Sequence, residues 1–122
     1  MQGKDMRVMV IGDKVEFKTI KDELEAYYKE IGCDFIEIVS CPINGGEYEV
    51  ICDEEGRLKS DPFISGVTKK GEPFFVGNLI IARYAGEGEL EGLEPDDMIR
   101  LANAIQYSLQ QGKVRPIILL DF

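Results

Sequence analysis

The sequence predicts an α+β fold, with a mainly antiparallel twisted sheet and two helices packed on one face of it. Two observations support this prediction. Several segments have strand composition and are separated by Gly, Pro and Asn turn signals. Two other segments place apolar residues at helical spacing, and they fall between runs of strands instead of alternating with single strands. Regular βαβ units are therefore not expected.

The first third of the chain predicts a β-hairpin followed by a helix. Two strand-like segments, 7–11 and 15–19, flank a short turn of Gly, Asp and Lys. From Ile20 onward the apolar residues share one helical face, and Thr19 is expected to cap the helix start. Gly32 is placed to end this helix in the left-handed conformation.

The middle of the chain predicts more strands. Residues 34–39 are apolar on both faces, as in a strand inside a sheet, and residues 47–59 alternate and then turn back as a second hairpin. Residues 60–73 contain Pro and Gly with few periodic apolar residues, which predicts a long connection. Residues 74–82 are the most apolar segment and predict a central strand with a bulge at Gly77-Asn78.

The last third predicts a helix and a final strand. Pro95 suits the first position of a helix, and Gly112 suits its end. The expected buried stripe of this helix is Met98, Leu101, Ala102, Ile105 and Leu109. The apolar tail 114–122 has Pro116 near its start, and it must pair either with this sheet or with another chain.

Length and composition indicate one domain, residues 1–122. Hydrophobic residues make up 44% of the chain and charged residues 30%, which is ordinary globular usage. Neither a membrane-spanning run nor a secretory signal is recognisable, so a cytoplasmic location without a membrane partner is expected. The net charge of −9, from 23 acids and 14 bases, argues against direct binding of nucleic acid.

The residue types needed for most catalysis are missing. The chain has no His, which is the usual base beside a nucleophilic Ser or Cys, and it has no phosphate-binding glycine loop. Cys33, Cys41 and Cys52 are 8 and 11 residues apart and lack paired metal-ligand spacing, so they are expected to be reduced. We therefore expect no catalytic residue, no cofactor and no metal.

Acidic residues supply the candidate functional positions. Two adjacent pairs, Glu54 with Glu55 and Asp96 with Asp97, have structural explanations in a turn and a helix start. The candidate interaction surface is a stretch without any base between Tyr84 and Ile99: Glu87, Glu89, Glu91, Glu94, Asp96 and Asp97. This stretch is either a solvated loop with a helix N-terminus or a row of carboxylates that imitates DNA phosphates.

Several motifs give the chain a family resemblance. They are the strand 7–11 with the hairpin and helix to Gly32, the strand 35–39, Glu54-Glu-Gly-Arg-Leu-Lys59, the strand 76–81 and Leu93-Glu-Pro-Asp-Asp-Met-Ile99. Over residues 6–106 the chain resembles domain of unknown function family 3846, small uncharacterised bacterial, phage and mobile-element proteins. Family members place a Pro and an Asn soon after the Arg-Leu-Lys strand, whereas Asp61-Pro-Phe-Ile64 lacks the Asn. Residues 107–122 are expected to add a helix end and a C-terminal strand.

The resulting functional prediction is a non-catalytic binding or interaction domain. The resemblance implies the context of a phage or mobile element and carries no activity. We expect a homodimer formed through an edge strand or the apolar tail, and a possible second protein partner at the acidic stretch. Two alternatives stay open: an acidic, DNA-mimic-like inhibitor of a DNA-binding protein, and an enzyme of unknown type.

Overall fold

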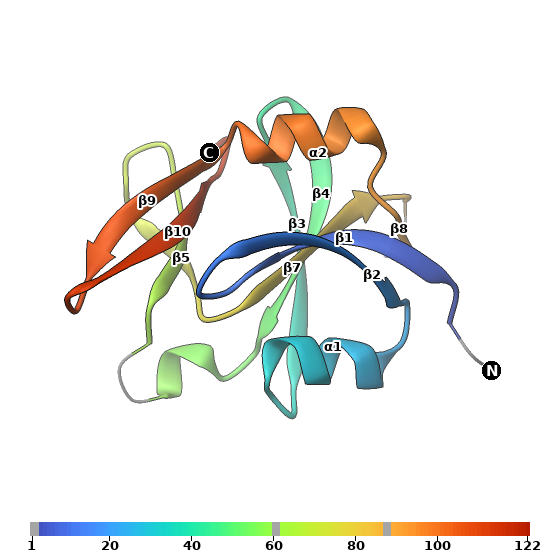
Figure 1. Cartoon of the computed structure of the whole chain (residues 1–122), viewed down its shortest axis with the longest axis horizontal. Helices are drawn as coiled ribbons and strands as arrows, with labels where there is room; N and C mark the ends of the chain where they lie inside the picture. The colour runs from blue at the N-terminus through green and yellow to red at the C-terminus, as the bar shows by residue number, and fades with distance from the viewer. Residues whose placement is uncertain (1–2, 60–61, 87–88) are drawn as a thin grey trace.

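The computed structural model describes residues 3–59, 62–86 and 89–122, whose strands form two sheets (Figure 1). The strands, in chain order, are β1 (Asp5–Ile11), β2 (Val15–Lys21), β3 (Ile36–Ile43), β4 (Gly46–Asp53), β5 (Ile64–Val67), β6 (Pro73–Val76), β7 (Leu79–Tyr84), β8 (Leu90–Glu91), β9 (Ile105–Gln110) and β10 (Lys113–Leu119). The helices are α1 (Leu24–Ile31), α2 (Pro95–Ala102) and the short 3-10 helix η1 (Gly56–Leu58).

The two sheets have different strand orders. Sheet A runs β2-β1-β7-β4-β3, with β8 beside β7, and sheet B runs β6-β5-β10-β9. All neighbouring strands are antiparallel except β5 and β10, which are parallel. The predicted α+β class with a mainly antiparallel arrangement is therefore confirmed. Within the described residues, the helices are all too short or too polar to cross a membrane.

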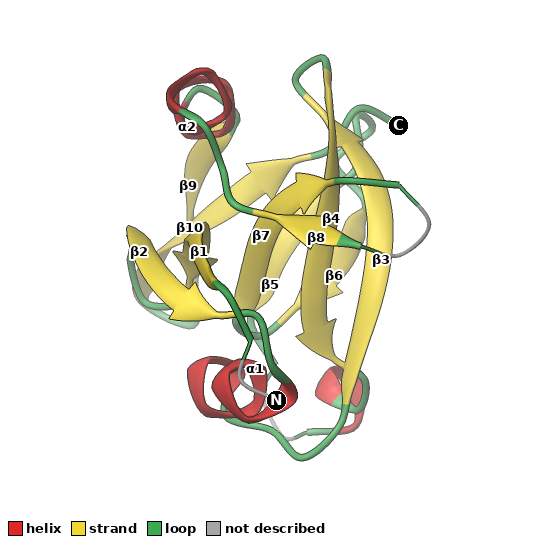
Figure 2. Ribbon diagram, turned by 90° about the vertical axis from the view of Figure 1, so that its right-hand side faces the viewer, coloured by secondary structure: helices red, strands yellow, loops and turns green. Residues whose placement is uncertain are grey.

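The two helices lie on opposite faces of sheet A, so the predicted packing on one face is wrong. Tyr27 and Ile31 of α1 join a cluster with Val8, Val10 and Ile80. Leu101 of α2 joins the other cluster, which contains residues of both sheets: Met9, Ile11, Val50, Ile81, Phe75 and Ile118. Successive residues of a strand point to opposite faces, so the strands β1 and β7 are buried on both sides. Figures 1 and 2 show α1 and α2 at opposite ends of the molecule.

Helix α1 begins later than predicted. Ile20 belongs to β2, because it pairs with Met6 and buries its side chain instead of starting the helix. The N-cap is Glu23, without a side-chain cap, so the expected cap by Thr19 is wrong. The predicted end is confirmed, since Gly32 has a left-handed φ of 78° and its N–H donates to the Tyr28 carbonyl at 2.8 Å.

Helix α2 begins at Pro95 as predicted but ends at Ala102. Residues 105–110 form β9, so the expected helix end beyond residue 107 is wrong. Leu109, predicted to be buried in a helical stripe, is 73% exposed. Gln111 and Gly112, with φ of 52° and 76°, form a two-residue turn that returns the chain as β10. This turn replaces the predicted helix end at Gly112.

Residues 47–82 depart most from the predictions. The segment after β4 forms η1 and not the return strand of a second hairpin, and residues 64–67 form a strand inside the predicted connection, whose last residue, Pro73, begins β6. Gly77, with φ of 78°, divides the predicted central strand into β6 of sheet B and β7 of sheet A. The β7 half does lie at the centre of its sheet, between β1 and β4.

Strand positions within the sheets also differ. The strand predicted inside a sheet, β3, lies at the edge of sheet A, where Pro42 is tolerated. The apolar tail forms β10 inside sheet B, so it pairs within the chain, with β9 on one side and β5 on the other. Pro116 faces only β9, because the pairing with β5 begins at Ile118. This leaves β9 as the outer strand beside the tail.

Candidate functional site

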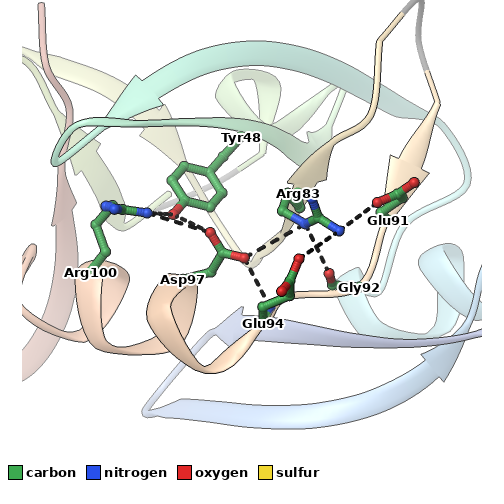
Figure 3. Close-up of polar contacts among 7 residues, drawn as sticks. All are labelled: Tyr48, Arg83, Glu91, Gly92, Glu94, Asp97 and Arg100. Carbon is green, nitrogen blue, oxygen red and sulfur yellow. Dashed lines mark hydrogen bonds and ion pairs between the residues drawn. The ribbon is translucent and has the colours of Figure 1, made fainter.

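The acidic stretch folds around Arg83 of β7 (Figure 3). The register of β7 with β8 places Arg83 opposite Glu91, and their ion pair is 2.5 Å long. A second ion pair joins Arg83 to Glu94 at 3.1 Å, and the Arg83 Nε lies 3.7 Å from Asp97. The Arg83 Nε also donates to the Gly92 carbonyl at 3.4 Å. One guanidinium therefore faces three carboxylates of this stretch.

Asp97 is the centre of the buried part of this network. Its carboxylate accepts a hydrogen bond from the fully buried Tyr48 hydroxyl at 2.9 Å and one from the Glu94 backbone N–H at 2.9 Å. The Glu94 side chain in return accepts from the backbone N–H of Asp97, which completes a capping box at the start of α2. Arg100, one turn later, lies 3.6 Å from Asp97. Burial keeps the pKa of Tyr48 above its ordinary value, so its hydroxyl stays a donor.

The six predicted surface residues are thus not one row. Glu91, Glu94 and Asp97 lie against Arg83, whereas Glu89 and Asp96 are exposed. Glu87 lies outside the described residues. The sequence showed no base inside the stretch, but the fold brings in bases from its two flanks. Salt bridges at partly exposed positions contribute little stability each, so the main structural role falls to the buried Asp97.

The predicted carboxylate pairs do not converge on a reacting group. Glu54 and Glu55 are both exposed, and Asp96 points to solvent while Asp97 is buried. A cleft of about 360 Å³ near the end of β4 is lined in part by Glu37, Cys52 and Arg57. Burial raises the pKa of the Cys52 thiol to about 12, so at neutral pH it is not a thiolate nucleophile.

In the part of the chain that the structure describes, β9 differs in its composition from β2, β3 and β6, which also end a strand order. The other end strands carry charges or proline: β2 has Glu16 and two lysines, β3 has Glu37 and Pro42, and β6 is four residues long and begins with Pro73. The β9 sequence Ile-Gln-Tyr-Ser-Leu-Gln contains neither a charged residue nor a proline. Charged residues and proline on edge strands prevent pairing with other chains. Strand β9 lacks this protection.

The same strand exposes large apolar side chains. Tyr107 is 65% exposed and Leu109 is 73% exposed, and both lie on one face of β9. Val114, directly opposite Leu109 on β10, is 63% exposed. At the base of the hairpin this face is covered, because Ile118 is fully buried in the core. We call Tyr107, Leu109 and Val114, together with the outer backbone edge of β9, the β9 surface. In Figure 1 the hairpin projects from the body of the molecule.

Gln110 fixes the hairpin to sheet B. Its side-chain amide accepts from the backbone N–H of Ile64 at 2.7 Å and donates to the Ile64 carbonyl at 2.9 Å. It also donates to the Ser108 hydroxyl at 2.9 Å. Arg115, opposite Ser108 on β10, binds Asp13 at 2.8 Å and lies 4.0 Å from the centre of the Phe63 ring. These contacts hold β9 in a defined position at the sheet edge.

The substitution Gln110→Ala is expected to lower the free energy of unfolding by about 1.5 kcal/mol, because both backbone groups of Ile64 lose their partner. Urea denaturation measures the change. Gln106→Ala, which truncates an exposed glutamine of the same strand, is the matched control and should change stability by less than about 0.5 kcal/mol. Equal effects of the two substitutions would show that the Gln110 amide does not anchor the hairpin.

Sequence reasoning did not find the β9 surface. Leu101, Ile105 and Leu109 are four residues apart and fit a helix, but Ile105, Tyr107 and Leu109 also alternate with period two. The signal for the second interpretation was Gly112, because a glycine between two strand-like segments suits the second position of a two-residue hairpin turn. The predicted acidic positions, by contrast, lie on α2 and before it.

Comparison with known proteins yields one family. A model of the family described as "Domain of unknown function (DUF3846)" matches residues 6–106. Neither a curated protein nor a solved structure matches the chain. The matched residues extend from β1 to the second residue of β9. Tyr107, Leu109 and Val114 all follow the matched segment.

Proposed function

Because the chain belongs to the family of domains of unknown function DUF3846, for which the description gives no activity, we propose a function from its surface: a non-catalytic protein-interaction domain that adds a partner's β-strand to β9. The observation that carries the proposal is that β9, at the end of sheet B, has neither a charged residue nor a proline while it exposes Tyr107 and Leu109. The origin in a phage or mobile element stays a prediction.

Strand addition fits both components of this surface. The backbone edge of β9 can form hydrogen bonds with a partner strand of any sequence, and the alternate side chains of β9 select among partners. Apolar side chains that are exposed in the lone chain become buried against the added strand, at about 25 cal/mol for each Å² of apolar area. Gln110 and Arg115 hold the hairpin in place before binding, which reduces the entropy that association would otherwise cost.

The acidic decoy receives less support. A phosphate-like row needs free, evenly presented carboxylates, whereas Glu91 and Glu94 are paired with Arg83 and Asp97 is buried. These contacts place a base inside the surface that would have to imitate DNA. The interaction function is therefore assigned to β9 and not to the acidic stretch.

Selection of short random peptides on the immobilised protein tests the proposal. Enriched peptides should alternate apolar and polar residues, as added strands do. Leu109→Lys should weaken their binding by about tenfold or more, because it places a charge on the edge. Leu58→Lys is the matched control, since Leu58 is 82% exposed on η1, outside β9. Failure of a monomeric protein to enrich alternating peptides, or equal binding of the peptides to both variants, would contradict strand addition at β9.

A further inference from the structure

The backbone of the hairpin determines which groups of β9 face outward. Gln110 and Lys113 flank a two-residue turn, and the positive φ angles of Gln111 and Gly112 identify a turn of type I′. The residues that flank such a turn form a hydrogen-bonded pair, and the pairs alternate along an antiparallel ladder. The backbone groups of Gln110, Ser108 and Gln106 therefore face β10. Those of Ile105, Tyr107 and Leu109 face away from it.

The position of Pro116 supports this alternation independently. Pro116 is opposite Tyr107, which the alternation makes a non-hydrogen-bonded pair. The nitrogen of a residue in such a pair points away from the partner strand, so the missing N–H of Pro116 removes no bond to β9. The Leu120 N–H, on the same side as the Pro116 nitrogen, indeed donates to Val67 of β5 at 2.9 Å.

We propose that the strand added to β9 is β9 of a second copy of this chain, paired antiparallel about a two-fold axis at Tyr107. This inference rests on the proposed function and names its partner. In a two-fold pairing, if one residue of the first copy lies opposite a second residue of the other copy, the reverse pair also forms. With the axis at Tyr107, the hydrogen-bonded pairs are Tyr107 with Tyr107, and Ile105 with Leu109 in both directions.

This register uses the outer edge of β9 fully. Three pairs with two bonds each give about six hydrogen bonds between the copies. A register displaced by one pair, with Tyr107 opposite Leu109, would place Ile105 opposite the turn residue Gln111 and lose one pair. The register with its axis at Tyr107 therefore forms more hydrogen bonds along the β9 edge than the neighbouring register does.

Side chains and charges favour a second copy as the occupant. Two molecules of net charge −9 repel each other, so they associate only where like charges do not meet. Strand β9 has no charge, and Lys113 and Arg115 behind it lie 3.7 and 2.8 Å from Asp13. In the proposed register apolar Leu109 faces apolar Ile105, and polar Gln106 faces polar Ser108. The strand is thus complementary to itself.

Sedimentation equilibrium at micromolar concentration tests the partner. The wild-type chain of 13.7 kDa should sediment with twice its monomer mass, Leu109→Lys as a monomer, and Leu58→Lys like the wild type. A monomeric wild type that still binds alternating peptides would overturn the second copy and leave the proposed function standing. A monomer without peptide binding would overturn both.

Cysteine cross-linking tests the axis in a Cys33→Ser background, since Cys41 and Cys52 are buried. Two Tyr107→Cys residues would have Cα atoms about 5.5 Å apart, within disulfide range, and should form a covalent dimer under mild oxidation. Two Leu109→Cys residues would have Cα atoms about 14 Å apart and should not cross-link. A dimer in which Leu109→Cys cross-links, or in which Tyr107→Cys does not, would overturn the proposed register.

Discussion

Replacing Asp97 with alanine is expected to lower the free energy of unfolding by about 3 kcal/mol and the melting temperature by roughly 10 °C. The side chain of Asp97 is only 11% exposed. Its loss leaves the buried Tyr48 hydroxyl without its carboxylate acceptor and removes half of the capping box at the start of α2. It also leaves Arg83 and Arg100 without the carboxylate between them. Thermal and urea unfolding followed by circular dichroism measure the loss.

The adjacent residue provides a matched control for this substitution. Asp96 is in the same helical turn and interacts with the same helix dipole, but its side chain is exposed. Asp96→Ala should therefore cost less than about 0.5 kcal/mol. If Asp97→Ala is no more destabilising than Asp96→Ala, the network drawn in Figure 3 is not a stabilising element.

The second large effect is a loss of stability in alkali. Burial, with a smaller contribution from a nearby Glu, raises the pKa of the Cys41 and Cys52 thiols from an ordinary 9.0 to about 12. Between these values the unfolded thiols release protons that the folded thiols keep, so the unfolded state is favoured as the pH rises. Each thiol should contribute a slope of up to about 1.4 kcal/mol per pH unit between pH 9 and 12, which urea unfolding at stepped pH measures.

A variant that lacks both buried thiols separates their contribution from that of other groups. Cys41→Ala with Cys52→Ala should be less stable at neutral pH, because packing is lost, but its stability should fall less steeply above pH 9. Some decline should remain, since burial also raises the pKa of Tyr27. Parallel curves for the variant and the wild type above pH 9 would assign the alkaline loss to other groups.

Local signals were sufficient for several features of the fold. The first hairpin, the end of α1 at Gly32 and the start of α2 at Pro95 are all determined within a few residues, by turn composition, a left-handed glycine and a fixed proline φ. The same holds for the α+β class, because it follows from the order of the periodic segments.

The candidate sites required contacts between distant parts of the chain. Asp97 and Tyr48 are 49 residues apart, and their hydrogen bond depends on how α2 packs over β4. Gln110 and Ile64 are 46 residues apart. No periodic pattern within one segment specifies such pairs, and a base-free acidic stretch gave no indication that Arg83 would lie against it.

The sequence by itself determined the fold class, the first hairpin and the two helix boundaries at Gly32 and Pro95, because those depend on backbone preferences of neighbouring residues. Only the tertiary structure decided that Gly77 separates two sheets, that the apolar tail becomes an inner strand, and that Leu109 is exposed on β9. For residues 105–109 both helical and strand spacing fit the apolar positions, and pairing with β10 selected the strand. Long-range strand pairing decides such cases, since it buries the tail and leaves β9 at the edge.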